Sequence, residues 1–126
     1  MLTIRKDNFR NEEEYITLES LVPKSHLVRK IENSLDFNFI YDEVKDLYSS
    51  IGAPSIDPVV LIKIVLIQYL FGIPSMRQTI REIEVNVAYR WFLGYSLTEK
   101  IPHFSTFNKN YERRFKDTEL FEIIFK

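Results

Sequence analysis

The chain has 126 residues, of which 45% are hydrophobic and 28% charged, a composition that fits one globular domain with a real core and excludes wholesale disorder. Cysteine is absent, which excludes a disulfide framework and a thiolate zinc site. The net charge of -1 hides an asymmetry, because residues 1–50 hold seven Lys and Arg against ten Asp and Glu, whereas residues 72–116 hold eight against four.

Residues 1–20 form a polar stretch with an acidic run, Glu12 to Glu14. We expect a loosely held arm there, which can include a short extended piece, and a helical domain over residues 21–126. The N-terminus lacks the uninterrupted apolar core of a signal peptide. The most apolar run, residues 59–73, carries Lys63 and Gln68 and is short for a membrane span. We therefore expect a cytoplasmic protein without a membrane segment.

Helical periodicity begins after this arm. Apolar residues recur on one side of residues 27–35 and again from about residue 37 to residue 48, the spacing of two amphipathic helices. Ser25 stands at the start of the first pattern and suits a helix cap. No segment has the alternation of a strand-rich core, so the predicted fold is all-α.

A central helix is predicted from Pro58 to Gly72. Asp57 can accept hydrogen bonds from the first turn, and proline at the first helical position costs no backbone bond. Gly72 suits a left-handed helix end. Because this segment is apolar nearly all round, we expect it to be buried.

Two short helices follow, over residues 75–85 and 86–94. Ser75 and Gln78 have the spacing of a capping box, while Asn86 can start the second helix and Gly94 can end it. Arg77 and Arg81 share the outer side of the first helix. Two short helices joined by a tight turn give the outline of a helix-turn-helix.

The last predicted helix begins at Ser105, after a loop over residues 95–104. At about 100° per residue, one side is aromatic: Phe107, Tyr111 and Phe115, joined by Phe104. The opposite side is cationic and hydrogen-bonding: Thr106, Lys109, Asn110, Arg113 and Lys116, with Arg114 at the border. These side-chain types contact phosphates and base edges, and the free N–H groups of the helix start suit a phosphate. A solvated basic face is the alternative.

The remaining candidates favour structural roles. We expect His26 and His103 at helix starts, since neither has a carboxylate at metal-ligand spacing, and we expect Trp91 and Phe92 in the core. The sequence has no glycine-rich phosphate loop, and we expect no cofactor.

The blocks VPKSHLVRKI, DFNFIYDEV, PSIDPVVLIKIVLIQYL, REIEVNVAYRWFLGY and PHFSTFNKNYERRF occur in this order. Together they resemble the N-terminal domain of bacterial insertion-sequence transposases of the DDE type (the InsH-type domain). The resemblance implies a helix-turn-helix-like domain that binds the terminal inverted repeats of a mobile element. In such proteins a following ribonuclease-H-like domain holds two divalent metal ions for strand cleavage and joining. This chain would lack that domain, so we expect no catalysis from it.

On this reading, double-stranded DNA is the partner. We assign Thr106, Lys109, Asn110 and Arg113 to a DNA groove, and Arg77, Arg81, Arg114 and Lys116 to phosphates. Arg113→Ala would cost about 1–3 kcal/mol if Arg113 grips a guanine edge. The alternative is a protein-interaction module that pairs two chains or holds the missing catalytic domain, with only non-specific DNA affinity. A third possibility is a short product that competes for the ends and represses transposition.

Overall fold

The computed structural model describes residues 1–45 and 56–114, and in these two ranges all regular secondary structure is helical. The prediction of an all-α fold is confirmed. The helices in chain order are α1 (Leu18–Leu21), α2 (Leu27–Ser34), α3 (Phe39–Val44), α4 (Pro58–Leu70), α5 (Met76–Val85), α6 (Val87–Leu93) and α7 (Phe104–Arg114).

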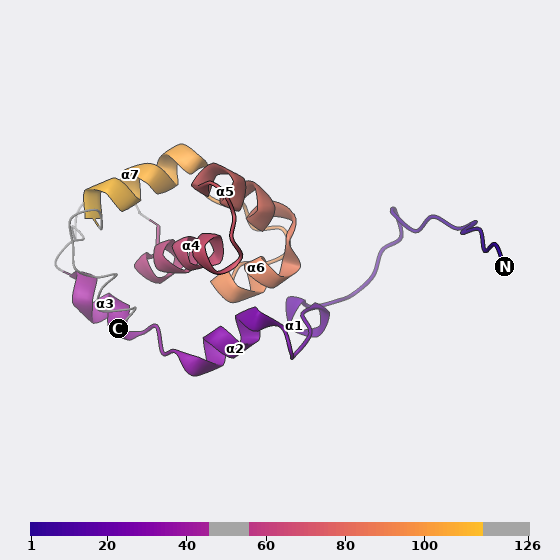
Figure 1. The fold of residues 1–126 in the computed structure, drawn as a ribbon, viewed down its shortest axis with the longest axis horizontal. Coiled ribbons are helices and arrows are strands. Elements are labelled where there is room, and N and C mark those ends of the chain that lie inside the picture. The colour runs from indigo at the N-terminus through magenta and orange to yellow at the C-terminus, as the bar shows by residue number, and fades with distance from the viewer. Residues whose placement is uncertain (46–55, 115–126) are drawn as a thin grey trace.

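Helix α4 forms the centre of the molecule, as its apolar sequence predicts. Figure 1 shows it enclosed by the other helices, while the N-terminal residues project away from them. Eight of its 13 residues are buried, and α3, α5 and α6 contact it directly. Burial on all sides leaves no polar face on α4, which explains why its sequence shows little amphipathic contrast. Of the described helices, none is both long enough and apolar enough to cross a membrane.

Local capping sets the ends of the central helices. Asp57 accepts bonds from the backbone N–H groups of Val59 and Val60 at the start of α4. Ser75 accepts one from Gln78 at the start of α5, and Asn86 accepts one from Tyr89 at the start of α6. Gly72 and Gly94 have positive φ angles of 63° and 80°, the left-handed conformation that ends a helix at low cost for glycine. These predicted starts and stops are confirmed.

Other predicted details differ from the structure. Helix α2 begins one residue later than a Ser25 cap requires, because the ring of His26 accepts from the N–H of Val28 and caps the helix. The end of the predicted arm contains the helical turn α1, capped by Thr17. Trp91 is only partly buried at the edge of the core, whereas Phe92 is 2% exposed. Trp91 is therefore less buried than the sequence predicts.

Helix α7 follows a loop that is anchored at both ends. Gly94 closes α6 at one end of the loop, and Ile101, 5% exposed, is buried in the core near the other end. Phe107, 2% exposed, fixes α7 against the same core, and α5 contacts α7. These contacts place α7 beside α5, as Figure 1 shows.

Candidate nucleic-acid interface

The aromatic side of α7 packs inward. Phe107 is buried, and its ring stacks on that of Tyr111 with centroids 6.0 Å apart. Phe104 and Tyr111 are partly buried and pack against the core. Burial raises the pKa of Tyr111 above its ordinary value, with a smaller contribution from the nearby Glu112 carboxylate. The aromatic anchor is confirmed for these residues, while Phe115 lies outside the described residues.

The opposite side of α7 faces outward. Thr106 and Lys109 are exposed, and Asn110 is half-buried. The Asn110 side-chain amide donates to the Thr106 carbonyl at 2.8 Å, so one of its donors is directed back to the helix. Arg113 and Arg114 form the last described residues of α7, and Lys116 lies outside the described residues. The structure therefore groups Thr106, Lys109 and Asn110 on one helix surface.

The start of α7 is capped by a histidine. His103 Nδ1 accepts from the backbone N–H of Ser105 at 3.1 Å and lies 2.8 Å from the Ser105 hydroxyl. The helix consequently begins at Phe104, one residue before the predicted start at Ser105. His103 thus has the predicted helix-start role, and it satisfies an N–H group that would otherwise face solvent.

Arg77 links α5 to α7. Its guanidinium carbon lies 4.6 Å from the centroid of the Phe104 ring, a cation–π distance. Arg77 remains exposed, and Arg81, one helical turn later, is exposed too. Two of the predicted phosphate-binding residues therefore lie on the outer side of the helix that contacts α7.

Three other basic residues are buried and unavailable to a partner: Arg29, Lys63 and Arg90, all 7–8% exposed. Arg90 belongs to the basic surplus of residues 72–116, but its guanidinium bonds only to backbone carbonyls of Glu84, Ser96 and Glu99 in this region. A count of basic residues in the sequence cannot separate buried from exposed ones, because the fold brings the acceptor carbonyls together. The exposed basic surplus is smaller than the sequence suggests.

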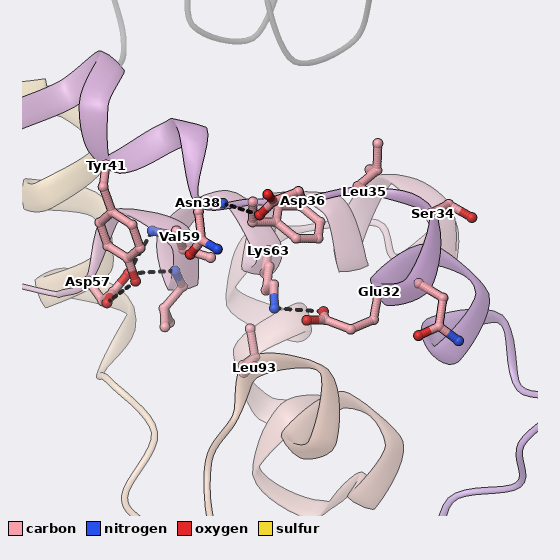
Figure 2. Close-up of a pocket in the computed structure, with 13 residues that line it drawn as sticks. Glu32, Ser34, Leu35, Asp36, Asn38, Tyr41, Asp57, Val59, Lys63 and Leu93 are labelled. Atoms are coloured by element: carbon pink, nitrogen blue, oxygen red, sulfur yellow. Dashed lines mark hydrogen bonds and ion pairs between the residues drawn. The ribbon is translucent and has the colours of Figure 1, made fainter.

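A cleft of about 730 Å³ lies on another part of the surface, between α2, α3 and α4. Figure 2 shows Lys63 pointing toward Glu32, with the two charged groups 2.8 Å apart, and Tyr41 donating to Asp57 at 2.8 Å. Burial, aided by the bond to Asp57, raises the pKa of Tyr41 to about 12. The carboxylates of Glu32, Asp36 and Asp57 line this cleft, so its chemistry disfavours a phosphate backbone. Among the described residues, no group of three His, Asp or Glu could hold a metal ion.

Residues 16–113 match a family model described as Transposase domain (DUF772). The matched segment begins just before Thr17, the cap of α1, and ends within the last turn of α7. No curated protein and no solved structure matches the chain.

Proposed function

The chain belongs to the DUF772 family of transposase domains, and we propose that it binds the terminal inverted repeats of a mobile element through α7. The observation that carries this proposal is the outer face of α7, where exposed Thr106 and Lys109 stand above a buried aromatic anchor. A helix that is fixed on one side can present its other side to a groove without losing its position.

The two arginines of α5 support the same surface. Arg77 and Arg81 are exposed on a helix that contacts α7, and cations beside a reading helix suit phosphate contacts that fix its register. We assign Thr106, Lys109, Asn110 and Arg113 to base edges. Arg77, Arg81, Arg114 and Lys116 take the phosphates.

Helix α6 is a poor candidate for the reading helix. Five of its seven residues are buried, so it offers little surface to a groove. If α5 and α6 correspond to a helix-turn-helix, this pair holds α7 in place, and α7 makes the base contacts. The assignment implies the DNA-recognition part of a bacterial, cytoplasmic transposase, and strand cleavage with divalent metal ions would be the task of a ribonuclease-H-like domain of the kind that such transposases carry.

The test is binding of the 126-residue chain to the element's terminal repeat and to a scrambled duplex across a salt series. We expect tight, repeat-selective binding with a steep salt dependence. Lys109→Ala should weaken repeat binding by about 1–3 kcal/mol if Lys109 contacts a base. If it contacts a phosphate, binding to both duplexes should weaken equally and the salt slope should fall by about 1.

Lys30→Ala is the matched control, because Lys30 is an exposed lysine on α2, away from α7. It should leave affinity and slope unchanged. Weak binding of the wild-type chain that is equal on both duplexes would contradict the proposal.

A protein-interaction module is the second candidate. Tyr69 and Val85 are 78% and 85% exposed, and exposed apolar side chains mark a contact between proteins where they join into a patch. Sedimentation over a range of concentrations tests this candidate. A stable dimer without selective DNA binding would favour it over end recognition.

A further inference from the structure

The buried guanidinium of Arg90 joins three separate segments of the chain. Its Nε and Nη2 donate to the Glu84 carbonyl in the last turn of α5, at 3.1 and 3.0 Å. Its Nη1 donates to the carbonyls of Ser96 and Glu99 in the loop after α6, at 2.8 and 2.7 Å. All four bonds end on backbone oxygens, so they fix the path of the main chain.

The loop held by Arg90 leads directly to α7. Within it, the Glu99 N–H donates to the Ser96 hydroxyl at 3.1 Å, and the Ser96 N–H donates to the Glu99 carboxylate at 3.3 Å. This reciprocal pair makes residues 96–99 a closed unit. Two residues later Ile101 enters the core, and α7 begins at Phe104. Any shift of the 96–99 unit relative to α5 would therefore be passed on to the start of α7.

A buried arginine that bonds only to carbonyls adds little net stability to a fold. Burying a charge costs free energy that neutral acceptors repay only in part. Buried polar groups of this kind can select one arrangement of the chain rather than add stability. Lysine could not replace Arg90 in this role, since its single ammonium cannot bond to acceptors on opposite sides as the planar guanidinium fork does.

We propose that Arg90 is a positioning residue that sets the placement of α7 relative to α5, and thereby the base selectivity of the α7 surface. The inference rests on the proposed function, because selectivity is defined only for a chain that reads DNA through α7. Arg90 itself is buried and touches no DNA. Without the Arg90 guanidinium, the positions of Lys109 and its neighbours on the DNA should become more variable, while the charges of these side chains stay the same.

The test compares wild-type chain with Arg90→Lys on two duplexes: one enriched by the wild-type chain from a randomised pool, and its scrambled version. Arg90→Lys keeps the charge, so the salt slope on the scrambled duplex should not change. The ratio of the two affinities should fall about tenfold or more, since misplaced bidentate contacts lose their discrimination.

Arg29→Lys is the matched control. Arg29 is buried to the same degree on α2 and also donates to backbone carbonyls, those of Glu19 and Val22, but it lies away from the loop that leads to α7. It should keep the wild-type affinity ratio. An unchanged ratio in Arg90→Lys, or an equal fall in both variants, would overturn the inference.

A distance measurement separates positioning from general loosening. The chain has no cysteine, so Gln78→Cys and Asn108→Cys, both at exposed positions of α5 and α7, can carry two spin labels without other changes. Pulsed electron resonance should give a narrow distance distribution in the labelled wild type and a broader or shifted one with Arg90→Lys. Lost selectivity with an unchanged distribution would contradict the positioning role.

The Arg90 assignment can still be tested if the chain selects no DNA sequence or if the Arg90 variant does not fold. If the wild-type chain enriches no sequence, end recognition fails, and the distance measurement alone decides whether Arg90 places α7. If Arg90→Lys does not fold, Glu99→Ala takes its place, because it opens the 96–99 unit from an exposed side chain. A fall in the affinity ratio with Glu99→Ala supports the inference, and a wild-type ratio overturns it.

Discussion

Lys63, the cation in the otherwise apolar central helix α4, has a structural role. Its ammonium donates to Glu32 at 2.8 Å and to the Phe92 carbonyl at 2.9 Å, and it lies 4.7 and 4.8 Å from the ring centroids of Phe37 and Phe92. The Phe92 carbonyl belongs to the last turn of α6, where carbonyls lack helical partners. Lys63 therefore acts as a C-terminal cap for α6, supplied by another helix.

Removing this cap should destabilise the fold. We expect Lys63→Met to lower the free energy of unfolding by about 1–3 kcal/mol, because the buried Phe92 carbonyl loses its donor while methionine fills most of the space. Lys63→Ala should cost more, since it also leaves a cavity. Urea unfolding measures both values. Lys30→Met, at an exposed position of α2, is the control, and a Lys63→Met chain as stable as wild type would refute the capping role.

At the scale of single elements, α1 depends on contacts outside itself. A helix of four residues is not stable alone. Glu19 ties it to the core by accepting from the Trp91 indole N–H at 2.6 Å and by pairing with the Arg29 guanidinium, which lies 4.5 Å from the Trp91 ring centroid. These bonds join α1 to α2 and α6.

The attachment of α1 should weaken in acid. The hydrogen bonds from Arg29 and then Trp91 lower the pKa of Glu19 below its ordinary value of 4.5. A lowered pKa in the folded state means that the contribution of Glu19 is present above pH 4.5 and is lost as the pH falls through the folded value. Trp91 is the sole tryptophan, so its emission reports this change directly.

We expect Trp91 emission in the wild type to shift to longer wavelength as the pH is lowered below about 4.5. Glu19→Gln should show part of that shift already at pH 7 and a smaller further change in acid. Glu14→Gln, which alters an exposed carboxylate of the arm, is the control and should behave as wild type. Identical acid titrations of Glu19→Gln and wild type would show that Glu19 does not hold Trp91.

Helix boundaries could be predicted wherever the cap is encoded locally. Asp57, Ser75 and Asn86 each bond to an N–H two or three residues ahead, so the sequence alone contains both partners. Ser25 and Ser105 are not the caps, because in each case the ring of a nearby histidine makes the cap instead: His26 follows Ser25 directly, and His103 lies two residues before Ser105. Choosing between two capping residues within one or two positions of each other needs the path of the backbone, which the sequence pattern does not give.

Over the whole molecule, the sequence predicts which side of a helix is buried better than it predicts which charged side chains are exposed. The buried face of α7 follows from helical geometry and is confirmed at Phe107. Arg81 and Arg90 look alike in sequence, yet Arg81 is exposed and Arg90 is buried. Carbonyls from the end of α5 and from the loop after α6, six to nine residues away in the chain, converge on Arg90. Backbone carbonyls belong to every residue, so the sequence does not mark which of them will accept from an arginine. The DNA-contact assignments on α7 stay predictions.

The N-terminal arm should be dispensable for the fold. Residues 1–17 are all exposed, and the family match begins only at residue 16, so removing residues 1–15 keeps the Thr17 cap and the Glu19 contacts. We expect the shortened chain to unfold with a free energy within about 0.5 kcal/mol of wild type, measured in urea. A loss as large as that of Lys63→Met would mean that the arm packs on the domain.

The same truncation also tests whether DNA binding belongs to the helical domain. It removes Arg5, Lys6 and Arg10 along with the acidic run, while Arg77, Arg81 and the α7 surface remain. If α5 and α7 make the phosphate contacts, the slope of affinity against salt concentration should be unchanged. If the three arm cations touched phosphates, the slope would fall by about 3, and the interface would have to extend from α7 to the arm.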